Sequence, residues 1–233
     1  ICTGANVTFT ATAGFSAYNF KVNGISVQNG ASNTFSTTTL SNPAVITVDI
    51  TNAAGCQSSF NPIVITVNAL PTGTLTATEN SGVANDNSIC SGSQVAFTAT
   101  AGFTNYDFQV NGLSQQNGLS STFNTSTLSN GDIVTVVVTN GNSCSATFNA
   151  ISFTVIPSPS GTLAATTTSI CAGDNIDFTA TGGYSNYDFQ VNGSTVQNGN
   201  LNTYSTASLN NGDVVTVIVT GANDCVSVFN SLT

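Results

Sequence analysis

The sequence predicts an all-β fold in which three tandem β-sandwich repeats form an extended rod. One long motif occurs three times along the chain. Within each copy, short runs of alternating apolar and polar residues are separated by Asn-Gly pairs, which favour β-hairpins. No window has the 3.6-residue apolar period of an amphipathic helix, so no helical layer is expected.

The repeated motif defines three units of similar length. The segment AGFSAYNFKVNG at 13–24 returns as AGFTNYDFQVNG at 101–112 and as GGYSNYDFQVNG at 182–193. An Ile-Cys pair opens each unit, and its cysteine stands at position 2, 90 or 171. The units are therefore about 80 to 90 residues long, which is the size of a small β-sandwich.

Strands are expected at equivalent places in each unit. In the second unit, 95–99 and 106–110 alternate apolar and polar residues, as half-buried strands do. The β-branched run at 133–138 predicts a more fully buried strand. Phe153 and Val155 predict a closing strand, and 73–78 predicts an opening strand.

Proline-containing segments separate the units, because proline cannot continue a central strand. Pro71 lies in NALPTGTL, and Pro157 and Pro159 lie in IPSPSGTL. The predicted repeats are therefore 1–70, which lacks the opening strand, 71–157, and 158–233, which lacks the closing strand. These ends have two interpretations: a window of a longer array, or a filament subunit that receives strands from its neighbours.

The six cysteines form three pairs with one spacing. The pairs are Cys2 and Cys56, Cys90 and Cys144, and Cys171 and Cys225, and the differences 56 − 2, 144 − 90 and 225 − 171 are equal. One pair in each repeat predicts three disulfides within the repeats, although six cysteines allow 15 pairings. Each would contribute about 4 kcal/mol in the chain-entropy model. Disulfides also predict an oxidising compartment outside the cytoplasm.

Charge and composition exclude several classes of partner. One Lys/Arg against ten Asp/Glu gives a net charge of −9. With Lys21 as the sole cation, we expect no binding to nucleic acid, which depends on Lys and Arg. An anionic membrane surface would repel the chain. No apolar run is long enough to span a bilayer, so we also expect no direct membrane insertion.

Catalytic chemistry has few candidates, because the chain has no histidine. Asp107 and Asp188 are equivalent, and so are Asp132 and Asp213, but the first repeat has Asn19 and Ala44 at these positions. A glycosidase needs two carboxylates of different roles on either side of one bond, and no such pair is apparent. We therefore predict no catalytic residue, no cofactor and no enzymatic activity.

One loop has two interpretations. The insertion at 79–87 contains Glu79, Asn85 and Asp86, whose hard oxygen donors suit Ca²⁺. The insertion does not match the D-x-D-x-D-G calcium loop, and an ordinary solvated loop is the other interpretation. No other metal site is expected, because the chain lacks both histidine and a C-x-x-C motif.

The repeated aromatic residues Phe15, Tyr18 and Phe20, with their equivalents, have the spacing of core residues. A platform for stacking sugars is the alternative, which makes surface glycans a candidate partner. This alternative corresponds to a carbohydrate-binding module.

The whole chain resembles a known type of repeat. The string IC-x-G-x-x-V-x-F-T-A-T-x-G-F-x-x-Y-x-F-x-V-N-G, followed by V-Q-N-G and L-x-N-G-D-x-V-T-V, resembles the immunoglobulin-like or PKD-like tandem repeats of giant Bacteroidetes surface proteins. Among these are the SprB-type gliding-motility adhesins. The first repeat departs from the pattern at 42–44, where Asn-Pro-Ala replaces Asn-Gly-Asp.

This resemblance implies a bacterial, extracellular, cell-surface protein with a role in adhesion, exported by type IX secretion and anchored elsewhere in its parent. We expect a structural stalk that supports adhesion or gliding by mechanical extension, with neighbouring repeats as its partners. The alternatives are a self-assembling filament subunit joined by strand donation and a carbohydrate-binding module.

Overall fold

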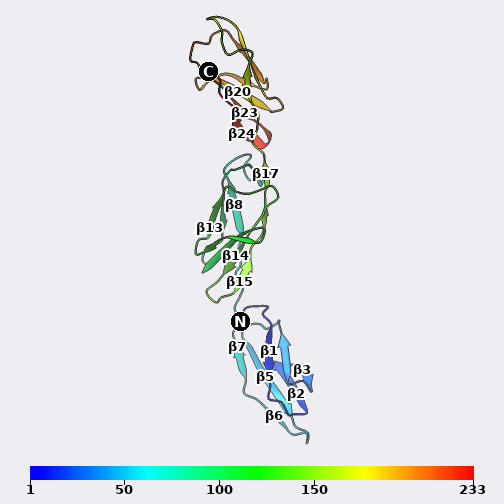
Figure 1. Ribbon diagram of the computed structural model, residues 1–233. Helices are drawn as coiled ribbons and strands as arrows, with labels where there is room; N and C mark the ends of the chain where they lie inside the picture. The colour runs from blue at the N-terminus through cyan, green and yellow to red at the C-terminus, as the bar shows by residue number, and fades with distance from the viewer.

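The computed structural model describes all 233 residues and is built almost entirely of strands. Its one helical element is the 3-10 turn η1 at Ala222–Asp224. Three β-units follow one another end to end, so that the molecule is elongated (Figure 1). The predicted all-β class is confirmed. No helix has the length and hydropathy that a bilayer span requires.

The second repeat has the fullest set of strands. They are β8 (Leu75–Glu79), β9 (Ser88–Cys90), β10 (Val95–Ala99), β11 (Asn105–Val110), β12 (Leu113–Gly118), β13 (Thr122–Thr125), β14 (Ile133–Thr139), β15 (Ser145–Thr147), β16 (Ile151–Ser152) and β17 (Thr154–Ile156). One sheet has the order β13-β10-β8, and the other has the order β12-β11-β14-β15 with β16 also on β14. Strand β17 pairs in parallel with β9.

The first and third repeats follow the same plan with fewer strands. The first contains β1 (Val7–Thr10), β2 (Ala17–Val22), β3 (Ile25–Gly30), β4 (Thr34–Thr37), β5 (Ala44–Thr51), β6 (Gln57–Ser59) and β7 (Ile63–Ile65). The third contains β18 (Leu163–Ala165), β19 (Ile176–Ala180), β20 (Asn186–Val191), β21 (Ser194–Gly199), β22 (Thr203–Thr206), β23 (Val215–Thr220) and β24 (Val226–Val228). In the first repeat β1 pairs only with β4, and in the third repeat no strand corresponds to β17.

Asn-Gly turns set the hairpin geometry, as predicted. Asn111 and Gly112 join β11 to β12 with positive φ values of 52° and 78°, which a type I′ turn requires. The Asn111 side chain also binds the neighbouring strand, because its Oδ1 accepts a hydrogen bond from Ile133 N at 3.0 Å. One side chain therefore fixes both the turn and its position beside β14.

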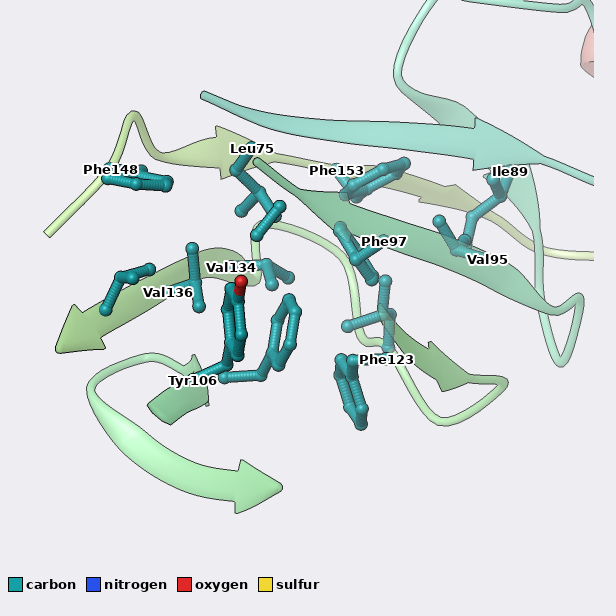
Figure 2. Close-up of a cluster of buried hydrophobic side chains, with 14 residues drawn as sticks. Leu75, Ile89, Val95, Phe97, Tyr106, Phe123, Val134, Val136, Phe148 and Phe153 are labelled. Carbon is teal, nitrogen blue, oxygen red and sulfur yellow. The ribbon is translucent and has the colours of Figure 1, made fainter. Parts of the chain in front are cut away.

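Each repeat has its own hydrophobic core. In the second repeat, 14 buried residues form one cluster between the two sheets (Figure 2). Phe97 is fully buried there, with Phe123 stacked at 6.0 Å and Phe153 edge-on at 5.6 Å. The first and third repeats have clusters of ten buried residues each. The cluster residues span 9–67, 75–153 and 163–229; the boundaries at 70 and 157 stay predictions.

A buried tyrosine ties the start of the second sheet to the first. Tyr106 is 2% exposed, and its hydroxyl accepts a hydrogen bond from Phe103 N at 3.1 Å and donates one to Thr100 O at 3.3 Å. The same two bonds occur at Tyr18 and Tyr187. The polar end of each ring is therefore satisfied inside the fold.

Candidate functional site

The junctions between repeats are the most distinctive feature of the molecule, and the cysteines lie there. The structure pairs Cys2 with Cys144 and Cys90 with Cys225, at Cα–Cα distances of 5.6 and 5.5 Å. Both bonds connect neighbouring repeats. Cys56 and Cys171 are exposed and unpaired. The predicted pairing within each repeat is therefore wrong for all three pairs.

Strand topology explains this correction. In every repeat, five strands lie between the first and the second cysteine: β1–β5, β10–β14 and β19–β23. Within the two sheets of the second repeat, β10 is antiparallel to β13, and β11 is antiparallel to both β12 and β14. An odd number of strands that alternate in direction carries the chain from one end of the repeat to the other. The spacing that all three pairs share therefore separates the two cysteines instead of bringing them together.

In the second repeat, the first cysteine lies at the end of a short parallel pair. Cys90 closes β9, and β17 lies alongside, with Thr154 N donating to Asn87 O at 2.9 Å and Ser91 N donating to Ile156 O at 2.9 Å. A turn follows in which Ser93 N donates to Cys90 O at 3.0 Å. The closing strand of a repeat therefore holds the first cysteine in place.

In the second repeat, the second cysteine lies in a turn organised by one asparagine. Asn140 Oδ1 accepts hydrogen bonds from the backbone N–H groups of Asn142 and Cys144, at 3.0 and 3.1 Å. Asn140 Nδ2 donates to Ala69 O at 3.0 Å, so that the same side chain reaches the linker before the second repeat. At the next junction, Asn223 Nδ2 donates to Ser88 O at 3.1 Å.

The proline linkers are packed against the following repeat. Pro71 and Pro159 are both buried. Tyr184 Oη donates to Ser160 O at 2.7 Å and accepts a hydrogen bond from Ser160 N at 3.0 Å. Each junction is therefore held both by contacts of its linker and by one disulfide.

The insertion at 79–87 also lies against the third repeat. A Cβ on Gly82 would lie 2.5 Å from Asn223 Nδ2, so only glycine fits there without a shift. Glu79 Oε2 accepts a hydrogen bond from Asn85 N, and Asp86 Oδ1 accepts one from Ser88 N, both at 2.8 Å. These carboxylates shape the loop, and no group of three or more His, Cys, Asp or Glu side chains occurs. Calcium binding at Glu79, Asn85 and Asp86 stays a prediction.

The four repeated aspartates lie apart, in strands and turns. Asp107 accepts hydrogen bonds from the side chains of Gln109 and Ser114 on the face of its sheet. Asp188 accepts one from Gln190, but its Oδ1 is buried without a partner. Asp132 and Asp213 each cap a turn, and the Asn210 N–H beside Asp213 lowers the pKa of that carboxyl.

The aromatic residues form cores instead of a surface platform. Tyr18 and Phe20 are each 2% exposed, and Phe15 packs edge-on against Tyr18 and Phe60. Their equivalents pack in the same way in the other repeats. Glycan binding therefore has no stacking face in these residues, and it stays a prediction.

Comparison with known proteins finds fold-level similarity only. No protein-family model and no curated protein matches the chain. Fibronectin(III)-like modules of CbhA from Clostridium thermocellum align over 67% of this chain and 88% of theirs, with 10% identity and a TM-score of 0.36. A Ca²⁺-stabilised ice-binding adhesin of an Antarctic bacterium aligns over 99% and 69%, with 17% identity and a TM-score of 0.35. SGBP-B from the mixed-linkage glucan utilisation locus of Bacteroides ovatus aligns over 99% and 63%, with 12% identity and a TM-score of 0.26.

Proposed function

We propose that this chain is a load-bearing segment of the stalk of an extracellular bacterial surface adhesin, in which disulfides fasten each repeat to its neighbour. The single observation that carries the proposal is the pair of bonds Cys2–Cys144 and Cys90–Cys225. Disulfides persist in oxidising compartments, which supports a position outside the cytoplasm. The resemblance to SprB-type repeats adds adhesion and gliding as the process that the stalk serves.

The bonds change how tension travels along the chain. The shortest covalent path enters at Cys2, crosses to Cys144, runs back to Cys90 and crosses again to Cys225. This path contains 63 Cα–Cα links, whereas the backbone from residue 1 to residue 233 contains 232. The proline linkers lie off the path, so an unfolded repeat cannot release the whole length of its chain.

Pulling on single molecules tests this proposal. The chain is held by handles at its two ends, with Cys56→Ser and Cys171→Ser present so that only the four remaining cysteines react. At ~3.5 Å per residue, the oxidised chain should stop extending at roughly 230 Å with the two bonds included. Under reductant it should reach roughly 810 Å. An oxidised chain that reaches roughly 620 Å would contain only a Cys90–Cys144 bond, and the proposal would fail.

The cellular part of the proposal has its own test. An antibody against this chain should label intact cells, and brief treatment with a non-specific protease should remove the label. Deleting the gene should reduce attachment and gliding while leaving growth in suspension unchanged. Label that appears only after cells are lysed would contradict the surface location.

A further inference from the structure

We propose that Cys56 and Cys171 are two halves of further junctions, at which additional repeats of this type attach through disulfides. This inference rests on the proposed stalk function and extends it to the two ends of the segment. The partner of Cys171 is the second cysteine of a following repeat, and the partner of Cys56 is the first cysteine of a preceding repeat. The four equivalent cysteines in this chain already pair by that rule.

The turn that holds Cys56 is already in the bonded conformation. Asn52 Oδ1 accepts hydrogen bonds from Ala54 N and Cys56 N, both at 2.9 Å, as Asn140 does around Cys144. The backbone contact Asn52 N to Cys56 O, at 3.0 Å, matches Asn140 N to Cys144 O at 2.9 Å. The unpaired thiol is therefore presented by the same turn that presents the paired one.

The turn after Cys171 is likewise preformed. Asp174 N donates to Cys171 O at 3.0 Å, and Ser93 N donates to Cys90 O at the same distance. The residue two positions after each of these cysteines is a glycine with positive φ: 78° at Gly92 and 89° at Gly173. What differs is the neighbouring strand, because nothing in the third repeat pairs with 169–171 as β17 pairs with β9.

A pocket of about 370 Å³, lined by both polar and apolar residues, lies where that strand would run. Its walls include Ile176, Phe178 and Val215. The equivalent residues of the second repeat, Val95, Phe97 and Val134, belong to the same core cluster as Phe153 of the closing segment. Phe178 therefore lacks the edge-on ring that Phe97 has at 5.6 Å. The pocket fits an incoming strand with a large apolar residue.

Two asparagines at the open ends lack the hydrogen bonds that their equivalents make. Asn130 Oδ1 accepts from Val155 N of the closing strand at 3.1 Å, but Asn211 in the pocket of the third repeat has no such partner. Asn149 Oδ1 accepts a hydrogen bond from Leu75 N in the opening strand at 2.7 Å, and Asn149 Nδ2 donates one to Leu75 O at 2.9 Å. Its equivalent Asn61 has no hydrogen bond and lines the groove beside β1.

These observations agree on one occupant. At the third repeat, a closing strand fills the pocket, pairs in parallel with 169–171 and leads through a linker into a repeat whose second cysteine reaches Cys171. At the first repeat, an opening strand covers the free edge of β1, and the preceding repeat brings its first cysteine to Cys56. Each bond forms from two thiols, which lose two protons and two electrons to a disulfide oxidant that is itself cleaved to two thiols.

Differential labelling of the native protein tests the inference. Parent protein is isolated from cells, denatured in iodoacetamide without reductant, and cleaved with chymotrypsin and elastase, and cross-linked peptides are sequenced. Cys171 should be recovered cross-linked to the second cysteine of a repeat, which comes shortly after a strand that ends in Val-Thr. Cys56 should be recovered cross-linked to the first cysteine of a repeat, which directly follows an isoleucine. The recombinant chain with the sequence above is the matched control, in which both residues should be alkylated.

One outcome overturns the inference. Alkylated Cys56 and Cys171 in the native protein would mean that these ends carry no covalent partner. A direct Cys171–Cys56 peptide would support the inference, because it obeys the same pairing rule, and it would identify the attached repeats as a separate copy of this chain. In either case, recovery of the Cys2–Cys144 and Cys90–Cys225 peptides from the same digest would leave the stalk proposal intact, whereas their absence would remove it.

Discussion

Cys90 and Cys225 are 135 residues apart in the sequence, yet their Cα atoms lie 5.5 Å apart and their sulfurs are bonded. This bond closes a covalent ring over residues 90–225, and the Cys2–Cys144 bond closes another over residues 2–144. The two rings overlap, because Cys90 lies within the Cys2–Cys144 ring and Cys144 lies within the Cys90–Cys225 ring. Unfolding one repeat therefore cannot separate it from its neighbours. In ordinary tandem arrays, neighbouring repeats stabilise one another through noncovalent contacts alone. In this chain, disulfides also couple neighbouring repeats.

The buried tyrosine hydroxyls should stabilise each repeat separately. Replacing Tyr106 with phenylalanine removes the partner of Phe103 N and Thr100 O, and leaving such groups unpaired costs about 1–3 kcal/mol. We expect Tyr18→Phe and Tyr187→Phe to have similar effects on their own repeats. The measurement is the amide hydrogen exchange of each repeat in increasing denaturant.

Tyr204 provides the control for this series. Its ring packs in the core of the third repeat, but its hydroxyl makes no hydrogen bond. Tyr204→Phe should therefore leave the free energy of unfolding within about 0.5 kcal/mol of the original. Equal losses at Tyr204 and Tyr187 would show that the hydroxyl contacts do not matter.

Gly82 should control how readily the second junction closes. At φ +75°, any replacement is strained, and its Cβ would also collide with Asn223 of the third repeat. Gly82→Ala should lower the equilibrium constant for forming Cys90–Cys225 in glutathione buffers by about fivefold or more, equivalent to ~1 kcal/mol. The Cys2–Cys144 bond should be unaffected.

Gly112→Ala is the matched control for the junction. Gly112 has nearly the same φ, +78°, but no atom lies within 4 Å of the position of its Cβ. It should destabilise the β11–β12 turn without changing the equilibrium of either disulfide. If both variants lowered the equilibrium constant for forming Cys90–Cys225 to a similar extent, the effect would come from general backbone strain and not from a specific contact between position 82 and Asn223.

Acid should weaken the first repeat through Asp49. Hydrogen bonds from Lys21 and then Ser59 lower the pKa of this carboxyl below its ordinary 3.8. Because the folded pKa is the lower one, the stabilisation is present above about pH 4 and is lost as the pH falls through the folded pKa. Lys21→Gln introduces the residue found in the other two repeats. In this variant, the melting temperature of the first repeat should decrease less steeply as the pH falls below about 4. An unchanged pH profile in that variant would contradict this role of Lys21.

Much of the fold could be predicted from the sequence because it depends on local signals. Asn111-Gly112 predicts a hairpin wherever it separates two strands, and the alternation at 106–110 predicts which side chains are buried. Tyr106 has the spacing of a core residue, but its hydroxyl contacts depend on how the chain folds back at Thr100, which no local pattern specifies.

The cysteine pairing could not be obtained from spacing alone. The separation along the chain is the same in all three pairs because the repeats are copies, and this equality carries no information about distance in space. The informative signal is the number of strands between Cys90 and Cys144. Five antiparallel strands place these two cysteines at opposite ends of one sandwich, and so against different neighbours.

Peptide mapping of the oxidised recombinant chain without reduction tests the central claim most directly. Digestion with chymotrypsin and elastase, with free thiols blocked beforehand, should yield cross-linked peptides joining Cys2 to Cys144 and Cys90 to Cys225. Cross-linked peptides joining Cys2 to Cys56 or Cys171 to Cys225 would contradict it, because each repeat would then be closed on itself and no bond would fasten it to the next.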